Sequence, residues 1–174
     1  MDQRLAGTVS INPQRKVFFV GGEKGGVGKS MFTSTLIEFC LESELRFILV
    51  ECDKVNPDTA RMYRSKIDVS FAYFSEDPNK RTKADPVFKA GLDFPLVLCN
   101  LPAQSYQGMK DWFIEDGLYE LGQEHNIAFY HWYISNGGYD SVQIFIRSLE
   151  ELGSYMQHFF VRNWGLCDSW NHVD

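Results

Sequence analysis

Residues that could hold phosphate groups lie in one short stretch near the start of the sequence. The segment KGGVGKS at positions 24–30 follows an apolar run at 17–20 and precedes a helical pattern that begins at Met31. Glycines let backbone N–H groups converge on phosphate oxygens without a Cβ in the way, and a helix N-terminus adds partial positive charge. Lys29 would then bridge the β- and γ-phosphates of a nucleotide, and the Ser30 hydroxyl would bind Mg²⁺.

The loop departs from the plain phosphate-loop pattern at its first position. The glycine expected five residues before Gly28 is replaced by Glu23, and a second lysine, Lys24, follows it. The alternative interpretation is a glycine-rich turn with two solvated lysines. With these residues KGGVGKS resembles the deviant Walker A motif of the ParA/MinD class of P-loop ATPases, which also includes nitrogenase iron protein and the arsenite-pump ATPases. The resemblance implies that Lys24 crosses a dimer interface to touch the nucleotide of the other subunit.

Two carboxylates lie at the carboxyl end of the second predicted strand, at the edge of the sheet where a ligand would bind. The strand at 46–52 is apolar in its centre, and Glu51 and Asp53 match the two acids that the ParA/MinD class carries here. The resemblance implies that Asp53 orients the attacking water and touches the metal shell, so that Lys24, Lys29 and Asp53 form the catalytic group. The alternative is that Asp53 caps the turn that follows it.

A third strand end carries an amide where the class has a carboxylate. The segment at 95–100 occupies the Walker B position and ends in Asn100 instead of aspartate. An asparagine can hydrogen-bond a metal-bound water, but it supplies no negative charge to Mg²⁺. The resemblance therefore implies a metal site of Ser30, Asp53 and Asn100 with weakened hydrolysis. The alternative is that Asn100 caps the next turn.

Two further positions complete the nucleotide site that the resemblance implies. In several relatives an asparagine after the last strand hydrogen-bonds the adenine edge, and Asn163 has that place, although a turn-forming role is equally consistent. Met31 replaces a hydroxyl residue that often touches the α-phosphate. The full set of implied nucleotide contacts is Glu23, Lys24, Gly25, Gly26, Val27, Gly28, Lys29, Ser30, Met31 and Asn163.

Short apolar segments alternate with helical patterns along the chain. Strands are predicted at 16–21, 46–52, 67–74, 95–100, 126–135 and 158–162, and helices at 30–42, 57–64, 85–90, 105–125 and 139–152. Strands that are apolar throughout are buried on both faces, which is typical of a parallel sheet between helices. The predicted fold is α/β, a doubly wound and mainly parallel sheet flanked by helices, in one P-loop domain over 1–174 that lacks the C-terminal helices of the class.

Two local predictions concern the connections. Pro57 should be the first residue of the second helix, with Asn56 as its N-cap. The polar stretch at 75–83 contains Pro78 and is predicted to be a loop, in which Lys80, Arg81 and Lys83 are solvated.

Composition limits the class of protein. Among the 174 residues the net charge is −6, which does not favour attraction of nucleic acid by the surface as a whole. The four cysteines have no CxxC spacing, and Cys40, Cys52 and Cys99 lie in apolar segments, so we expect buried thiols in a reducing compartment. The start of the sequence has no apolar signal region, and no apolar run is as long as a membrane span. These observations predict a cytoplasmic protein.

Three functions follow from these residues. The first is an ATPase that binds ATP, ADP and Mg²⁺, dimerises on ATP and serves plasmid or DNA partition or mobilisation, with a partner protein that stimulates hydrolysis. The second is a nucleotide-dependent binding switch with little or no hydrolysis, which Asn100 favours. The third is a phosphotransferase or ATP-dependent synthetase on the same scaffold, but it needs a substrate pocket beyond the γ-phosphate, and the sequence shows no constellation for one.

Overall fold

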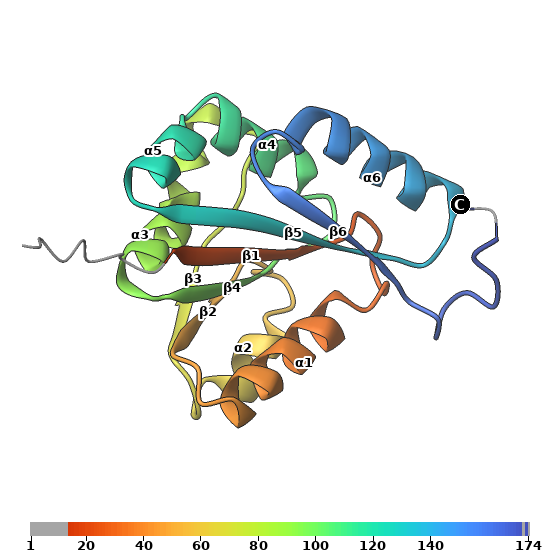
Figure 1. Ribbon diagram of the computed structural model, residues 1–174, viewed down its shortest axis with the longest axis horizontal. Helices are drawn as coiled ribbons and strands as arrows, with labels where there is room; N and C mark the ends of the chain where they lie inside the picture. The colour runs from red at the N-terminus through yellow and green to blue at the C-terminus, as the bar shows by residue number, and fades with distance from the viewer. Residues whose placement is uncertain (1–13, 172, 174) are drawn as a thin grey trace, which may run out of the picture.

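Six parallel strands form a single sheet at the centre of the molecule (Figure 1). The computed structural model describes residues 14–171 and 173. The strands are β1 (Arg15–Gly21), β2 (Phe47–Glu51), β3 (Val69–Phe71), β4 (Leu96–Asn100), β5 (Ile127–Ser135) and β6 (Gln157–Arg162), and their order in the sheet is β3-β2-β4-β1-β5-β6. The predicted α/β fold with a parallel sheet is confirmed.

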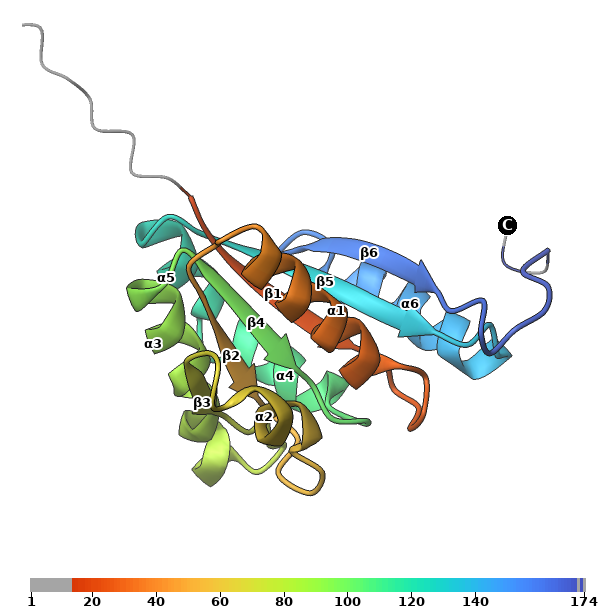
Figure 2. The ribbon, with the colours of Figure 1, turned by 90° about the horizontal axis from the view of Figure 1, so that it is seen from below.

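Helices cover both faces of this sheet. One face carries α1 (Lys29–Glu42) and α2 (Asp58–Tyr63), and the other carries α3 (Asp85–Asp93), α4 (Tyr106–Ile114), α5 (Leu118–Glu124) and α6 (Tyr139–Leu152) (Figure 1). Seen from the side of α1, this helix lies across β1 and β4 near the middle of the sheet (Figure 2). The core on the opposite face is rich in aromatic rings, because Phe113 packs edge-on against Phe19 and Phe129 at centroid distances of 5.7 and 4.8 Å. The aromatic residues thus supply core packing.

Two helical predictions were wrong in detail. The stretch at 105–125 is not one helix but two, α4 and α5, because Gly117 takes a left-handed φ of 70° between them. The second helix begins at Asp58, and Pro57 is its N-cap without a capping side chain. Asn56 is therefore not the N-cap, and its carbonyl instead accepts a hydrogen bond from the Asp58 N–H at 2.8 Å.

The basic stretch predicted as a solvated loop contains a short 3₁₀ helix, η1 (Pro78–Ala84). The Asp77 carboxylate caps its start by accepting a hydrogen bond from the Asn79 N–H. Arg81 is not solvated but pairs with Glu115 at 2.6 Å and Asp116 at 3.3 Å, just after α4. The stretch is ordered because these ion pairs join it to a neighbouring helix.

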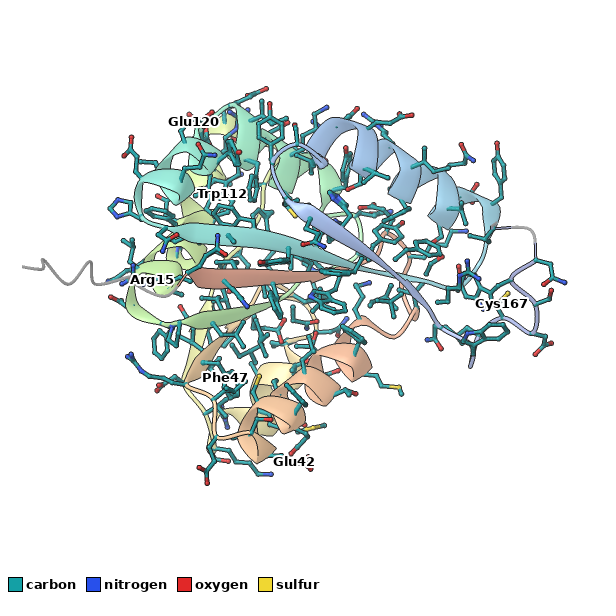
Figure 3. All side chains as sticks on the ribbon, in the orientation of Figure 1. Arg15, Glu42, Phe47, Trp112, Glu120 and Cys167 are labelled. Atoms are coloured by element: carbon teal, nitrogen blue, oxygen red, sulfur yellow. The ribbon has the colours of Figure 1, made fainter. Side chains whose placement is uncertain are left out.

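The carboxyl ends of the strands gather the predicted site at one edge of the sheet. Asn100 pairs in register with Val20 on β1 and with Glu51 on β2, so the segments after these strands leave the sheet side by side. Figure 3 labels Arg15 at the amino end of β1 and Cys167 beyond β6, which lie at opposite ends of the sheet. In the part of the chain that the structure describes, no helix has the length and apolarity to cross a membrane.

Candidate functional site

The loop between β1 and α1 has the shape that its glycines predict. Gly26 and Gly28 have φ values of 74° and 103°, a left-handed conformation that strains other residues. A Cβ added at Gly25 or Gly26 would meet nothing within 4 Å, so the space beside the loop is open. At Gly28 an added Cβ would lie 2.8 Å from Nδ2 of Asn163. The positive φ angles favour glycine at positions 26 and 28, and the close approach of Asn163 excludes a larger residue at position 28.

The loop leads directly into an uncapped helix N-terminus. Gly28 is the N-cap of α1, no side chain hydrogen-bonds to this end, and the first turn contains no acidic residue. The first N–H groups of an α-helix have no partner within the helix, and the helix dipole makes this end partly positive. The open loop and the start of α1 together offer backbone donors and partial positive charge, which suits an anion.

Lys29 is the first residue of α1 and is partly buried. Its Nζ donates a hydrogen bond to the backbone oxygen of Lys24 at 3.0 Å. Burial lowers the pKa of Lys29, while the charges of Asp53 and Glu23 oppose that shift. The structure therefore brings together three residues that the sequence separates: the loop lysine, the residue in the place of the first glycine, and the carboxylate after β2.

Asp53 forms the turn that the alternative interpretation described, and it also faces the loop. One carboxylate oxygen, Oδ1, accepts hydrogen bonds from the N–H groups of Val55 and Asn56 at 3.0 and 2.9 Å. The same side chain interacts electrostatically with Lys29. The turn fixes the carboxylate near Lys29 of the glycine loop, so the capping role and the predicted role are compatible.

Asn100 belongs to a buried hydrogen-bond network and does not cap the turn. It is 2% exposed, its Nδ2 donates to Oε1 of Glu51 at 2.9 Å, and its Oδ1 accepts from the Thr33 hydroxyl at 3.1 Å. Glu51 is fully buried and also accepts from the N–H groups of Asp53 and Ala60. Burial raises the pKa of Glu51, although these donors oppose the shift. In this structure the amide of Asn100 holds a buried carboxylate and faces no solvent.

Glu23 connects the loop to the opposite face of the sheet. Its Oε1 accepts a hydrogen bond from the N–H of Tyr106, the first residue of α4, at 3.1 Å. Burial raises the pKa of Glu23, and the Tyr106 N–H and the charge of Lys29 oppose this. The Tyr106 hydroxyl in turn donates to Glu151 on α6, which also pairs with Lys110 at 2.7 Å. Sequence reasoning placed Glu23 in the loop but gave no sign of its partner, which is 83 residues away.

Lys24 makes an ion pair within its own chain. Its Nζ lies 3.0 Å from Oδ2 of Asp140, in the first turn of α6, and the two side chains are 42% and 70% exposed. Asp140 is 116 residues away and was not among the predicted site residues. Its only sequence signal is its place just after the Asn136-Gly137-Gly138 turn that precedes α6.

Asn163 contacts the loop but also forms a turn. Its Nδ2 donates to the backbone oxygen of Val27 at 2.9 Å, and its Oδ1 accepts from the N–H of Gly165 at 3.0 Å. It therefore lies beside the loop and makes the turn-forming contact of the alternative interpretation, while its contact with an adenine edge stays a prediction. The side chains of Ser30 and Met31 are exposed at the start of α1, with Met31 75% exposed.

Comparisons with known proteins show the fold but no family. No protein-family model matches the sequence. A curated relative, "Protein MobD" of Acidithiobacillus ferrooxidans, is 31% identical over 62 residues, which are 36% of this chain and 27% of that protein. The chain thus matches only about a quarter of that relative.

Solved structures resemble the chain as a whole. FlhF complexed with GMPPNP and Mg²⁺ matches with a TM-score of 0.50 at 10% identity, over 85% of this chain and 55% of FlhF. A de novo designed protein of P-loop NTPase fold has a TM-score of 0.49 at 12% identity, over 92% of this chain and 88% of the design. At such low identity the likeness to FlhF concerns the fold alone, and it agrees with the strand, glycine loop and helix described above.

Proposed function

We propose that this chain is an ATP-binding and ATP-hydrolysing switch of the ParA/MinD type, which dimerises on ATP and serves partition or mobilisation of a plasmid or other DNA. The observation that carries this proposal is the open glycine loop at the uncapped start of α1, with Lys29 at its centre and Asp53 beside it. Such a loop would offer a polyphosphate chain backbone hydrogen-bond donors and positive charge.

The residues fit a nucleotide and its metal in the following way. The loop N–H groups and Lys29 would bind the phosphates, and Lys29 would exchange its hydrogen bond to the Lys24 carbonyl for phosphate oxygens. Ser30 and Asp53 would hold Mg²⁺, which neutralises negative charge on the phosphates when bound. The buried network of Asn100 and Glu51 would help to position Asp53. Glu51 accepts hydrogen bonds from the Asn100 amide and from the Asp53 N–H, and so fixes the start of the turn that Asp53 forms.

The cross-subunit role of Lys24 gives the sharpest test of the switch. An exposed ion pair is worth at most about 1 kcal/mol, so the contact with Asp140 can be exchanged for a phosphate of a second subunit. We expect Lys24→Ala to bind MgATP with near-normal affinity and to lose ATP-dependent dimerisation. Light scattering with and without ATP measures the dimer, and calorimetric titration measures the affinity.

Asp140→Asn is the matched control for this experiment. It breaks the same ion pair but leaves the lysine in place, so we expect a dimer that forms at equal or up to about fivefold lower protein concentration. A dimer that persists in Lys24→Ala would contradict the cross-subunit role. A dimer lost in both variants would mean that the pair within the chain is what supports association.

A second candidate function is a switch that binds ATP with negligible turnover. It is supported by Asn100, because the strand that ends beside the loop carries no carboxylate at that position. Single-turnover hydrolysis by the unmodified chain separates the two functions: release of phosphate well above the rate without protein supports an ATPase, and its absence despite ATP binding supports the binding switch.

Glu23 offers a further prediction, because a carboxylate beside a phosphate site repels the ligand. Glu23→Gln keeps an oxygen for the Tyr106 N–H and removes the charge, so we expect MgATP affinity to rise several-fold, on the order of 1 kcal/mol. Glu23→Ala also removes that acceptor and should cost about 1 kcal/mol of folding stability. Calorimetric titration measures the MgATP affinity of Glu23→Gln, and urea denaturation measures the folding stability of Glu23→Ala. Weaker ATP binding by Glu23→Gln would show instead that the carboxylate itself holds the nucleotide or its metal.

The proposal also covers the cellular compartment and the binding partners of the chain. Cys40, Cys52 and Cys99 are buried free thiols, which supports the proposal of a reducing cytoplasm. A partner protein that stimulates hydrolysis is part of the proposal. Binding to nucleic acid would need a local basic surface, because the chain as a whole carries a net charge of −6.

A further inference from the structure

A hollow opens at the same edge of the sheet as the glycine loop. Its volume is about 290 Å³, and it lies between the segment that follows β2, the segment that follows β3, and η1. Cys52, Phe74 and Pro102 give it an apolar lining. This edge is where open α/β sheets bind their ligands. A different pocket, of about 630 Å³, is lined by the amino-terminal half of β5 and so lies away from the loop.

Three lysines line this hollow in a chain that is acidic as a whole. Lys83 makes no side-chain ion pair or hydrogen bond with any residue that the structure describes. The Lys54 ammonium lies 5.8 Å from the centroid of the Tyr73 ring and, within the described residues, has no carboxylate partner. Lys80 pairs with Asp77 at 2.7 Å. Two of the three positive charges are therefore uncompensated.

One carboxylate also lines the hollow and must be weighed against these charges. Asp53 is that residue, and its Oδ1 already accepts two backbone N–H groups, from Val55 and Asn56. Because Lys80 is paired with Asp77, the lining has two unpaired ammonium groups, Lys54 and Lys83, against one carboxylate. An anion that entered would gain these two positive neighbours, together with an apolar surface for its organic part.

From this lining we propose that the hollow binds a small organic anion, a carboxylate or phosphate ester that carries a short aromatic or apolar group. Its volume lies near the lower end of the range for small-molecule sites. The anionic group would contact Lys54 and Lys83, and the apolar part would lie against Phe74 and the Tyr73 ring. A nucleic-acid backbone fits less well, because it needs a longer basic track than three lysines around a hollow.

The position of Asp53 relates this site to the proposed nucleotide. The same carboxylate lines the hollow and interacts with Lys29 of the glycine loop, so a ligand here would lie next to the phosphate end of the nucleotide. The sequence shows no constellation for such a second ligand, because Lys80 and Lys83 belong to the stretch predicted as a solvated loop and Lys54 is far from them along the chain. The fold brings the two segments together.

The test uses phenyl phosphate and benzoate as probes, with benzyl alcohol as a neutral control. Binding is followed through the backbone amide shifts of the ¹⁵N-labelled protein. We expect at least one of the two anions to change the amide chemical shifts of residues 53–55, 73–75 and 80–83. The relative affinity of the two probes then distinguishes a phosphate ester from a carboxylate. Lys54→Gln with Lys83→Gln should weaken binding about tenfold.

Two controls keep this result separate from the phosphate loop. Lys66→Gln with Lys89→Gln removes the same charge from exposed positions outside the hollow and should leave the affinity unchanged. Lys29→Ala should retain probe binding at the hollow even if it no longer binds nucleotide, so failure of the nucleotide proposal would leave this one standing. Shifts confined to residues 25–30, equal binding of benzyl alcohol, or no shift at millimolar probe would each overturn the inference.

Discussion

Replacing Lys29 with alanine is expected to weaken MgATP binding by roughly 10- to 100-fold. A hydrogen bond to a charged group contributes about 1.5–3 kcal/mol, and Lys29 is the partly buried ammonium of the loop. Among the described residues the ammonium of Lys29 donates a side-chain hydrogen bond only to the Lys24 carbonyl, so it can turn to a phosphate without breaking an ion pair. Isothermal titration calorimetry with MgATP measures the loss.

The folded state should survive this change. Burial disfavours the Lys29 ammonium, as its lowered pKa shows, so its removal should leave the thermal midpoint unchanged or slightly higher. Lys89→Ala, at an exposed position on α3, is the control and should bind MgATP normally. Unaltered MgATP affinity in Lys29→Ala would remove the basis of the proposed nucleotide site.

The second large effect is on folding, and it concerns the residue that departs from the Walker B pattern. Asn100→Asp is expected to lower the free energy of unfolding by about 2–4 kcal/mol at neutral pH. The change replaces the amide that donates to buried Glu51 with a second carboxylate at a distance of 2.9 Å. It removes a hydrogen bond to a charged group and places two like charges in a buried site. Urea denaturation measures the cost.

The stability of this variant should depend on pH, because two adjacent buried carboxylates bind a proton more tightly than separate ones do. Burial already raises the pKa of Glu51, and a second carboxylate raises the pKa of the pair further. The folded state then binds more protons than the unfolded state, so the variant loses stability as pH rises and recovers it as pH falls toward the unfolded carboxyl pKa of about 4. A penalty that is the same at pH 4.5 and pH 7.5 would contradict this explanation.

Two further variants isolate the cause. Asn171→Asp makes the same chemical change at an exposed position and should cost little. Glu51→Gln in the Asn100→Asp background removes one of the two charges and should recover more than half of the loss, a coupling that a double-mutant cycle measures. These results bear on activity as well, since a gain of hydrolysis in Asn100→Asp can be interpreted only in a sample shown to be folded.

The sequence was informative where structure depends on neighbours along the chain. The apolar runs located all six strands to within a few residues, with β3 much shorter than its predicted span, and the loop glycines are needed for the backbone conformations they adopt. The break at Gly117 was less visible, since a glycine inside a helical pattern either weakens the helix or ends it.

The missing parts of the site depend on contacts between distant segments. The partners of Glu23 and Lys24 are 83 and 116 residues away, and no local pattern relates such positions. Asn100 illustrates the same limit. The sequence shows that an asparagine replaces the expected aspartate, but the role of Asn100 depends on its hydrogen bond to Glu51 in the adjacent strand. In a single sequence the residues of a site can be found one by one, whereas their pairing depends on the fold, as the register of β2 and β4 pairs Glu51 with Asn100.

The hydrogen bond from the Tyr106 N–H to Glu23 has a mechanical consequence. Glu23 is joined covalently to the glycine loop, while Tyr106 begins α4 and reaches α6 through Glu151. Any ligand that displaces the Glu23 carboxylate must therefore either move the start of α4 with it or leave the Tyr106 amide without this acceptor. Displacement at the loop would then be transmitted to the helices on the far side of the sheet.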